Sequence, residues 1–398
     1  MTSITEGLPL RILHLGKYYP PAPGGIESHV QTLARYQAKL GCDVRVLCVS
    51  HVDGAGKDIT HARFRPTRSV VESDGSVRVE RVGRLFGVSR LEVCPSLLGK
   101  IRRDTAAADI VHLHTPNPLM LGAWWAAGAR DKPVVVTHHS DVIKQRFLRY
   151  AVAPFESAVY RSARIILTTS PKYLEDSGQL RPFSEKTQAL PLAIDLEPYL
   201  HPTREILARA QELRQGLSGG PLWLMVGRLT YYKGYHVALN SLADVPGRLV
   251  IVGTGPLESE LREQAKRKGV LDRIEWKTNL GQQELIALYH AATALWFPSV
   301  AKSEGFGLVQ VEAMAAGCPV INTDIPGSGV SWVSQDEVSG LTVPVGDSYR
   351  FAEAARNLFE NKALRERLSQ GAIERAKSEF DSRTMAYRSL EYYHKALS

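Results

Sequence analysis

The sequence predicts an α/β protein with two similar, doubly wound parallel-sheet halves and a helical tail. Short β-branched runs alternate with helical patterns along most of the 398 residues, which is typical of parallel strands joined by helices. The alternation starts afresh after a linker-like segment at 201–220. Several predicted strands also end next to glycines or histidines, at the sheet edge where α/β proteins bind ligands.

Four parts are predicted along the chain. A first domain covers residues 1–200 and a second covers 221–375, with 201–220 as the linker between them. Residues 376–398 are predicted as a C-terminal helix that returns to the first domain, because its aromatic side chains need a surface to pack against.

The first domain opens with a strand at 10–16, followed by a loop that ends in Gly24 and Gly25. A Gly-Gly turn in this place suits a phosphate-binding loop, and it suits a plain tight connection equally well. The polar segment 51–76, rich in Gly and Arg, is predicted as an exposed loop. The remaining strands are predicted at 42–50, 109–114, 133–138 and 163–169.

Four histidines fall at or near the ends of these strands: His112, His114, His138 and His139. They are either ordinary strand-end residues or groups that face a ligand, since ligands bind at this edge. A zinc cluster is disfavoured, because no carboxylate or cysteine stands at ligand spacing from them.

The second domain begins with a strand at 222–226, which leads into a loop containing Arg228 and Lys233. Two cations in a loop beside a helix start suit a diphosphate, although a solvated basic loop has the same composition. Later strands are predicted at 248–252, 273–277, 294–297 and 320–323.

A stretch with two carboxylates, 303–320, stands out in this domain. Gly305 and Gly307 allow close approach of a ligand, and the helix that starts near Leu308 offers free N–H groups to an anion. Glu304 precedes the helix, and Glu312 lies on its inward-facing stripe. A buried carboxylate is costly unless hydrogen-bonded, so either neighbouring backbone or a ligand must bind it.

The composition narrows the function classes. The net charge of +8 is compatible with nucleic acid, an anionic membrane or an acidic small molecule. Residues 1–9 contain no basic and apolar pattern of a secretory signal, and the apolar segment 118–129 is too short to span a membrane, so the protein is expected in the cytoplasm. The cysteines form no CxxC pair and are predicted to be reduced and buried: Cys42, Cys48, Cys94 and Cys318.

Taken together, the motifs resemble the GT-B retaining glycosyltransferases of family 4. The motifs that carry this likeness are Gly24-Gly25-Ile26-Glu27, Gly227-Arg228 with Lys233-Gly234, Gly253-Thr254-Gly255-Pro256, and Glu304 with Glu312. The resemblance implies two Rossmann-like domains that face each other across a cleft, with the helical C-terminal tail packing back. It also implies a nucleotide-sugar donor, held mostly by the second domain.

The resemblance assigns roles to single residues. Arg228 and Lys233 would hold the donor diphosphate, and Gly25 would bring backbone close to the phosphate. Glu312 would accept hydrogen bonds from the ribose, and the base would lie between Gly253 with its loop and residues 277–280.

For the sugar and the chemistry, the resemblance implies a second group. Glu304 and the backbone N–H groups of Phe306, Gly307 and Leu308 would bind the donor sugar. The family's active-site histidine follows a Thr-x-His strand end, which indicates His139 and not His138. No Asp-x-Asp triplet occurs, so we predict an enzyme without metal or other cofactor. Retention would follow from a front-face displacement, in which the departing phosphate takes the acceptor's proton.

The N-terminal segment 16–27 is similar to the corresponding segment of bacterial mannosyl- and rhamnosyltransferases of O-antigen and exopolysaccharide assembly. This favours GDP-mannose as donor, with a UDP-sugar as the alternative. The acceptor is predicted to be a glycan on a lipid diphosphate at the inner membrane. Basic residues of the protein are predicted to contact this membrane surface peripherally. The residues predicted for this contact are Lys100, Arg102, Arg103, Arg146 and Arg149.

Three rival functions make different demands on the sequence. A nucleotide-sugar epimerase or dehydrogenase needs Gly-x-Gly-x-x-Gly after its first strand, which Gly16-Lys17-Tyr18 does not offer. A nucleic-acid-binding protein is disfavoured, because the basic residues are not interleaved with aromatics. An inactive sugar-nucleotide-binding protein would have no need of the full set of carboxylates and cations.

Overall fold

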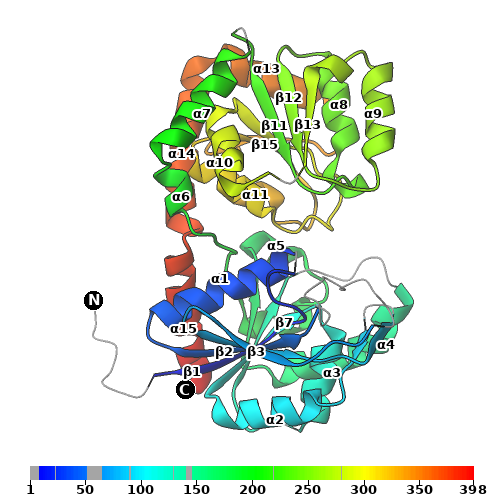
Figure 1. The fold of residues 1–398 in the computed structure, drawn as a ribbon, viewed down its shortest axis with the longest axis vertical. Coiled ribbons are helices and arrows are strands. Elements are labelled where there is room, and N and C mark those ends of the chain that lie inside the picture. Colours follow the sequence, from blue (N-terminus) through cyan, green and yellow to red (C-terminus); the bar gives the residue numbers. More distant parts are fainter. Residues whose placement is uncertain are drawn as a thin grey trace. The chain divides into compact units, whose positions relative to one another are not determined.

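The structure is a computed structural model that describes residues 9–22, 24–51, 65–88, 91–128, 130–139, 146–217, 219–278 and 280–398 (Figure 1). The chain divides into two compact units. The first unit contains Met1–Thr169, Ser177–Pro191 and Ser382–Ser398. The second contains Ser170–Asp176 and Leu192–Asp381.

The first unit is built on an eight-stranded sheet with the order β10-β9-β8-β7-β1-β2-β4-β3. Every neighbouring pair is parallel except β3 and β4. The strands are β1 (Arg11–Leu15), β2 (Asp43–Val49), β3 (Val70–Asp74), β4 (Val77–Val82), β7 (Ile110–Thr115), β8 (Val134–His138), β9 (Ile165–Thr168) and β10 (Thr187–Ala189). A separate hairpin joins β5 (Phe86–Val88) to β6 (Leu91–Val93).

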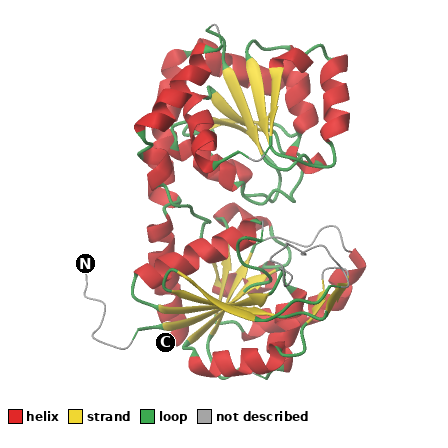
Figure 2. Cartoon of the chain, viewed as in Figure 1, coloured by secondary structure: helices red, strands yellow, loops and turns green. Residues whose placement is uncertain are grey.

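Helices cover the sheet of the first unit, as Figure 2 shows. All six residues of β7 are buried, as expected for a central parallel strand with helices on both faces. The helices are α1 (Gly25–Lys39), α2 (Leu97–Ala107), α3 (Pro118–Ala126), α4 (Arg146–Ser162), the 3-10 helix η1 (Arg181–Lys186) and α15 (Ser382–Leu397).

One prediction for this unit is wrong. Residues 70–74, within the segment 51–76 predicted as an exposed loop, form strand β3 and pair with β4 as an antiparallel hairpin. The signal was the dipeptide Asp74-Gly75, since Gly75 has φ 61° and Asp-Gly is a frequent hairpin turn. Asp74 then binds the Tyr19 hydroxyl at 2.7 Å and pairs with Arg35. Residues 52–64 lie outside the described residues.

The second unit has a six-stranded, fully parallel sheet with the order β13-β12-β11-β14-β15-β16. The strands are β11 (Leu222–Val226), β12 (Arg248–Val252), β13 (Ile274–Lys277), β14 (Ala294–Phe297), β15 (Val320–Thr323) and β16 (Gly340–Val343). The helices are α5 (Pro171–Asp176), α6 (Glu197–Leu200), α7 (Arg204–Gln215), η2 (Tyr231–Lys233), α8 (Tyr235–Ala243), α9 (Glu258–Arg267), η3 (Leu271–Arg273), α10 (Gln282–Ala291), α11 (Leu308–Ala315), α12 (Val330–Val333), α13 (Ser348–Glu360) and α14 (Lys362–Glu379).

The predicted linker at 201–220 is largely a helix of the second unit. Thr203 caps α7 by accepting from the Ile206 amide, and Ile206 and Ala210 are buried in the core. Arg209 of α7 also pairs with Glu284 of α10 at 3.1 Å. The segment was mistaken for a linker because its apolar stripe is narrow and its other faces are charged.

The end of the chain is helical, as the sequence predicts, and α15 belongs to the first unit. The side-chain nitrogen of Gln37 in α1 donates to Ser389 Oγ at 2.9 Å and to the Tyr393 hydroxyl at 3.0 Å. Tyr392 donates to the carbonyl oxygen of Ala189 at 3.1 Å. The crossing from the second unit to the first therefore falls at Ser382, later than the predicted residue 376.

The predicted fold class, two doubly wound units with a helical tail, is confirmed. None of the described helices has both the length and the apolar character needed to cross a membrane.

Candidate functional site

The strand order of the second unit reverses between β11 and β14, which pair in parallel. Strands β12 and β13 extend the sheet beyond β11, while β15 and β16 extend it beyond β14. The loops that leave the carboxyl ends of β11 and β14 therefore diverge, and open α/β sheets bind ligands at such points. These two loops carry most of the donor-binding residues predicted from the sequence.

Glycines let the neighbouring loops touch. Gly234 has φ 70°, and a Cβ atom there would lie 1.8 Å from the carbonyl oxygen of Pro298 in the loop after β14. Gly253, which follows β12, has φ 147°, and its Cβ atom would lie 2.0 Å from the carbonyl oxygen of Gly227. A larger residue at either position would push the loops apart.

We expect Gly234→Ala to lower the free energy of unfolding more than the control Gly269→Ala. The two glycines have φ of 70° and 68°, so alanine at either position carries a similar backbone strain, about 1–2 kcal/mol. Position 269 has open space around it, whereas position 234 adds the collision with Pro298. Overpacking of this kind costs about 1–3 kcal/mol more. Urea denaturation measures the difference, and equal losses would contradict the close approach.

A buried ion pair joins the two loops at the switch point. Lys233 Nζ lies 2.7 Å from Glu304 Oε2, and their side chains are only 13% and 10% exposed. Lys233 Nζ also lies 4.9 Å from the centre of the Phe297 ring. Arg228, in the same loop, is exposed and has no ion pair with a described residue. The second unit thus brings two of its predicted donor residues, Lys233 and Glu304, into direct contact.

The loop from Glu304 to the start of α11 is fixed by a glycine and by hydrogen bonds to its carbonyl oxygens. Gly307 has φ 79° and caps the helix, and a Cβ atom there would lie 2.5 Å from Phe297 Cζ. Ser328 donates to the Glu304 carbonyl oxygen, and the Gly329 amide donates to that of Gly305 at 2.9 Å. Among the described residues no acceptor binds the backbone N–H groups at the helix start: Phe306, Gly307 and Leu308.

Glu312, in α11, has a protein partner that the sequence reasoning missed. The buried Tyr289 of α10 donates its hydroxyl proton to Glu312 Oε2 at 2.6 Å. Burial raises the pKa of the Glu312 carboxyl above its usual range. Its other oxygen forms no hydrogen bond with a described residue, so half of the carboxylate's capacity remains for a ligand.

In the first unit, Gly25 is the first residue of α1, and Gly24 precedes it without a side-chain cap. The sheet order here reverses between β1 and β7, so α1 starts beside the switch point. His139 directly follows β8, the strand next to β7, and its amide donates to the Thr115 carbonyl oxygen at 3.0 Å.

The structure gathers five histidines of the first unit into one buried cluster, more than the sequence predicts. They come from β1, α1, β7 and the end of β8: His14, His29, His112, His114 and His139. His138 points elsewhere and lies 2.7 Å from the Tyr160 hydroxyl. His29 is 1% exposed, and neither of its ring nitrogens has a hydrogen-bond partner within the part of the chain that the structure describes.

Burial keeps these imidazoles neutral, because a cation is poorly solvated there. It lowers the pKa of His14 to about 4 and that of His29 to about 3. It also lowers the pKa of His112, His114 and His139 well below the usual value. In two triplets, His14–His112–His114 and His29–His114–His139, the ligand nitrogens lie within 4.8 Å of one another. Neutral imidazoles so placed are able to hold a metal ion.

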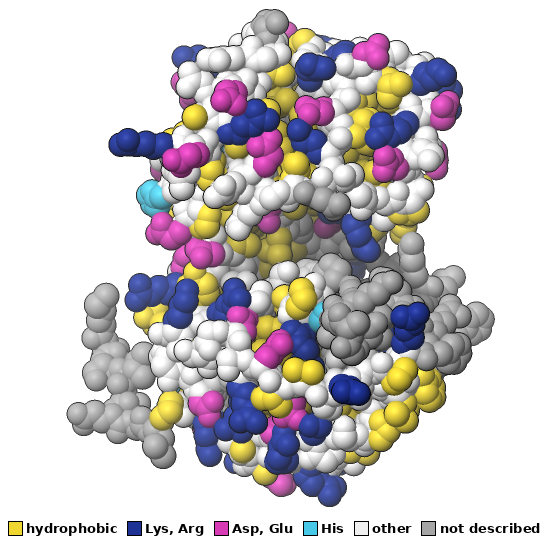
Figure 3. Space-filling model, viewed as in Figure 1, with side chains coloured by type: hydrophobic (Ala, Val, Ile, Leu, Met, Phe, Trp, Pro, Cys, Tyr) yellow, Lys and Arg dark blue, Asp and Glu magenta, His cyan; other side chains and the backbone are white. Residues whose placement is uncertain are grey.

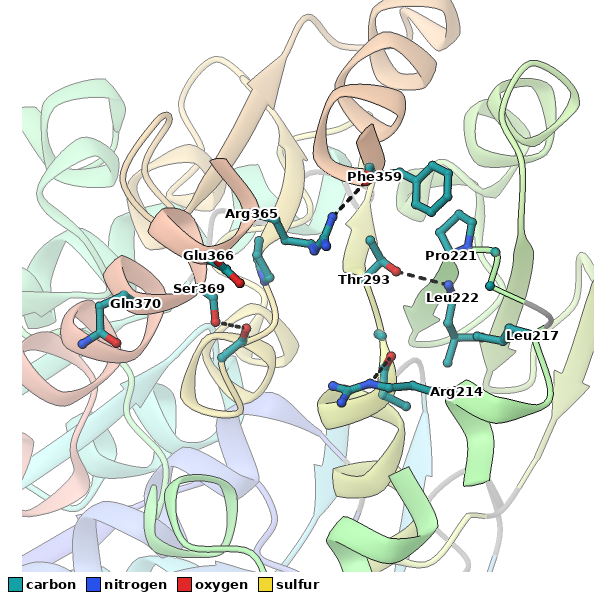
Figure 4. Close-up of a pocket in the computed structure, with 16 residues that line it drawn as sticks. Arg214, Leu217, Pro221, Leu222, Thr293, Phe359, Arg365, Glu366, Ser369 and Gln370 are labelled. Carbon is teal, nitrogen blue, oxygen red and sulfur yellow. Dashed lines mark hydrogen bonds between the residues drawn. The ribbon is translucent and has the colours of Figure 1, made fainter. Parts of the chain in front are cut away.

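A cavity of about 510 Å³ lies at the other edge of the second sheet (Figure 4). Leu222 begins β11, and Thr293 and Pro319 directly precede β14 and β15, so the cavity is at the amino ends of the strands. Its polar groups are engaged within the protein: Arg365 donates to the Phe359 carbonyl oxygen at 3.0 Å, for example. The cavity is therefore a poor candidate for the donor site.

Three of the basic residues predicted to meet a membrane have partners within the first unit. Lys100 and Arg103 both pair with Glu80, and Arg102 donates to the Ala127 carbonyl oxygen at 3.1 Å. These pairings partly neutralise the charges that would attract a membrane. The side chains of the other two, Arg146 and Arg149, lie outside the description.

On the face of the second unit drawn in Figure 3, Lys and Arg side chains are interspersed with Asp and Glu. Nucleic-acid-binding surfaces instead gather positive charge into one patch or stripe. This face therefore gives no support to the nucleic-acid alternative.

Two family models match the chain. Residues 23–198 match "Glycosyltransferase Family 4", and residues 211–375 match "Glycosyl transferases group 1".

Curated relatives match over nearly the whole length. The D-rhamnosyltransferase WbpZ of Pseudomonas aeruginosa is 32% identical over 93% of this chain and 92% of its own. The O-antigen chain mannosyltransferase C of Escherichia coli is 29% identical over 93% and 94%. A GDP-mannose:cellobiosyl-diphosphopolyprenol alpha-mannosyltransferase of Xanthomonas campestris is 27% identical over 98% and 97%.

Among solved structures, the sucrose-phosphate synthase of Thermosynechococcus elongatus superposes with a TM-score of 0.74 and 22% identity, covering 97% of this chain and 98% of its own. This likeness concerns the fold. With the two family models and the 32% identical relative, it shows that the chain belongs to the glycosyltransferases of family 4, enzymes with the GT-B fold.

Proposed function

We propose that this glycosyltransferase transfers a hexose, most readily mannose from GDP-mannose, with retention, in the assembly of a cell-surface polysaccharide. The observation that carries the proposal is the ion pair between Lys233 and Glu304 at the switch point of the second unit. It puts a cation suited to a diphosphate within 2.7 Å of a carboxylate suited to sugar hydroxyls.

Donor binding would exchange the partners of this ion pair. Lys233 and the exposed Arg228 would bind the diphosphate, together with the unbonded N–H groups at the start of α11. Glu304 would then accept hydrogen bonds from the sugar. Each charge keeps a partner in both states, so neither is left buried and alone.

The nucleoside would lie beside the same loops. The oxygen of Glu312 that Tyr289 leaves unbonded would accept from the ribose hydroxyls. The base would lie against the loop of Gly253, which directly follows β12 at the same edge of the sheet.

The chemistry would be a front-face displacement. As the bond from the anomeric carbon to the diphosphate oxygen breaks, the acceptor hydroxyl bonds to the same face of that carbon and passes its proton to the departing diphosphate. Lys233, Arg228 and the N–H groups at the start of α11 would stabilise the leaving group's charge without a metal. His139 would contact the reacting sugar from the first unit.

The donor and acceptor are proposed from the relatives. One relative is named as a mannosyltransferase of O-antigen chains, and another as using GDP-mannose and a diphosphopolyprenol acceptor. We therefore propose a glycan on a lipid diphosphate as acceptor, met at the membrane surface as a peripheral contact. The D-rhamnosyltransferase relative makes a deoxyhexose the second sugar to test.

A thermal-shift screen of nucleotides tests the donor. A ligand at 100 times its dissociation constant stabilises the protein by about 2.7 kcal/mol, which is readily seen. We expect a shift with GDP that Lys233→Met reduces strongly. We also expect hydrolysis or transfer of GDP-mannose in the presence of EDTA. A shift with UDP alone would overturn the donor, and loss of activity in EDTA would overturn the metal-free mechanism.

A further inference from the structure

We infer that a directed chain of hydrogen bonds, Gln37–His14–His114–His139, fixes the His139 ring in one tautomer. In that tautomer the proton is on Nε2 and Nδ1 is left as a hydrogen-bond acceptor. The inference makes Nε2 of His139 a hydrogen-bond donor and Nδ1 an acceptor. It also makes the buried residues Gln37, His14 and His114 positioning residues. Its consequence for catalysis rests on the role proposed above for His139.

The direction of the chain is set at its far end, in α15. Ser389 Oγ donates its one proton to the Ala386 carbonyl oxygen at 2.7 Å, so toward Gln37 it acts only as an acceptor. The atom of Gln37 that faces Ser389 at 2.9 Å must therefore be the amide nitrogen.

Tyr393 supports the same orientation. Its hydroxyl lies 3.0 Å from the Gln37 amide nitrogen and 2.6 Å from His112 Nδ1. It accepts from the first group and donates its proton to the second. The Gln37 amide therefore donates both of its protons to residues of α15, and its oxygen faces His14.

From Gln37 onward, each hydrogen bond determines which nitrogen of the next histidine ring carries the proton. The Gln37 oxygen accepts from His14 Nε2 at 2.8 Å, so the neutral His14 ring has no proton on Nδ1. His14 Nδ1 accepts from His114 Nε2 at 3.0 Å. His114 Nδ1, now also without a proton, accepts from His139 Nε2 at 3.2 Å. The pKa of each ring is lowered by burial, which supports one proton per ring.

The hydrogen-bond chain uses only Nε2 of His139 and leaves Nδ1 available to another group. His139 Nδ1 has no hydrogen-bond partner among the described residues. With its proton on Nε2, a neutral His139 can only accept at Nδ1. A group that meets it there must be a donor, as a sugar or acceptor hydroxyl is. With the other tautomer Nδ1 would carry the proton and donate, so the group that meets it would have to be an acceptor.

A metal ion held by His29, His114 and His139 is the competing explanation of the cluster. It would use the nitrogens that lie within 4.8 Å of one another, and it would provide a partner for His29. The hydrogen-bond chain is favoured because it satisfies both nitrogens of His14 and of His114 in a single direction. It leaves His29 as an edge-on neighbour whose ring centre is 5.1 Å from that of His139.

Nitrogen-15 NMR of histidine-labelled full-length protein reads the tautomers directly. We expect His139, assigned by single substitution, to show a protonated Nε2 and a bare Nδ1. Gln37→Met removes the acceptor at nearly constant volume and should shift His139 to a tautomer mixture, whereas Gln37→Glu keeps an acceptor for His14 and should preserve the wild-type pattern. A proton on Nδ1 in the wild type, or an unchanged pattern in Gln37→Met, would overturn the inference.

Kinetics separate this inference from the proposed function. Gln37→Met should lower kcat by about tenfold, the lower end of what loss of an orienting partner costs a metal-bound histidine, with little change in the KM for the donor. His14→Phe should act alike. The matched control is His29→Phe, which changes an equally buried ring without hydrogen bonds and should leave kcat and the tautomers unchanged.

Two further outcomes are decisive. If Gln37→Met changes the tautomer and leaves kcat unchanged, the chain stands and the catalytic role of His139 falls. Stoichiometric zinc in the purified protein, with metal-shifted nitrogen signals from His29, His114 and His139, would overturn the chain.

Discussion

Replacing Glu304 by glutamine is expected to reduce kcat by about 100-fold, in the range found when one preorganised group at a transition state is lost. The amide keeps the shape of the side chain but has one acceptor oxygen in place of two. It also leaves the buried Lys233 Nζ without the charge that now lies 2.7 Å away. Because Lys233 stays free to bind phosphate, the dissociation constant for GDP should change little. Steady-state kinetics with GDP-mannose and calorimetric titration of GDP measure the two effects.

Glu312→Gln is the matched comparison, a second carboxylate-to-amide change eight residues along the same segment. If Glu312 binds the ribose, its affinity for GDP should fall by about tenfold, the value of a hydrogen bond to a charged group. Its effect on kcat should be much smaller than that of Glu304→Gln. Equal and small effects of both changes would show that the donor binds elsewhere.

The first unit is expected to lose stability steeply as the pH falls below about 6.5, the ordinary pKa of histidine. In the folded state burial lowers the pKa of His14 to about 4 and of His29 to about 3. Between pH 6.5 and 4.5 the unfolded chain therefore binds more protons than the folded one, and stability falls with falling pH. Each such histidine contributes about 1.4 kcal/mol per pH unit across this window.

Urea denaturation between pH 7.5 and 5 measures this slope, with hydrogen exchange to assign the loss to the first unit. His29→Phe removes one buried imidazole that has no hydrogen bond to lose, and should flatten the slope by one histidine. Stability that stayed constant from pH 7.5 to 5 would contradict a cluster of neutral, buried rings.

The sequence was sufficient where short-range chemistry decides the structure. The strand runs, the glycine loops and the helical tail are local patterns, and the fold class followed from them. The predicted loop of Lys233 and the predicted loop of Glu304 do meet, because parallel strands bring their carboxyl ends to one edge of the sheet.

The sequence was insufficient where partners come from distant segments. Tyr289 binds Glu312 from another helix, and Gln37 binds His14 from α1. Nothing local distinguishes these residues from ordinary core and surface side chains. The strand-end positions of His112, His114 and His139 indicated part of the histidine cluster, but His14 was missed, and the structure pairs it in register with His112.

The position of α15 bears on how the protein is made. The first unit begins at the N-terminus, but the hydrogen bonds of Gln37 end on Ser389 and Tyr393, more than 350 residues later. A ribosome that adds about 5–20 residues per second exposes an incomplete first unit for tens of seconds before those partners emerge. During synthesis the second unit is therefore the first of the two whose entire chain is available to fold.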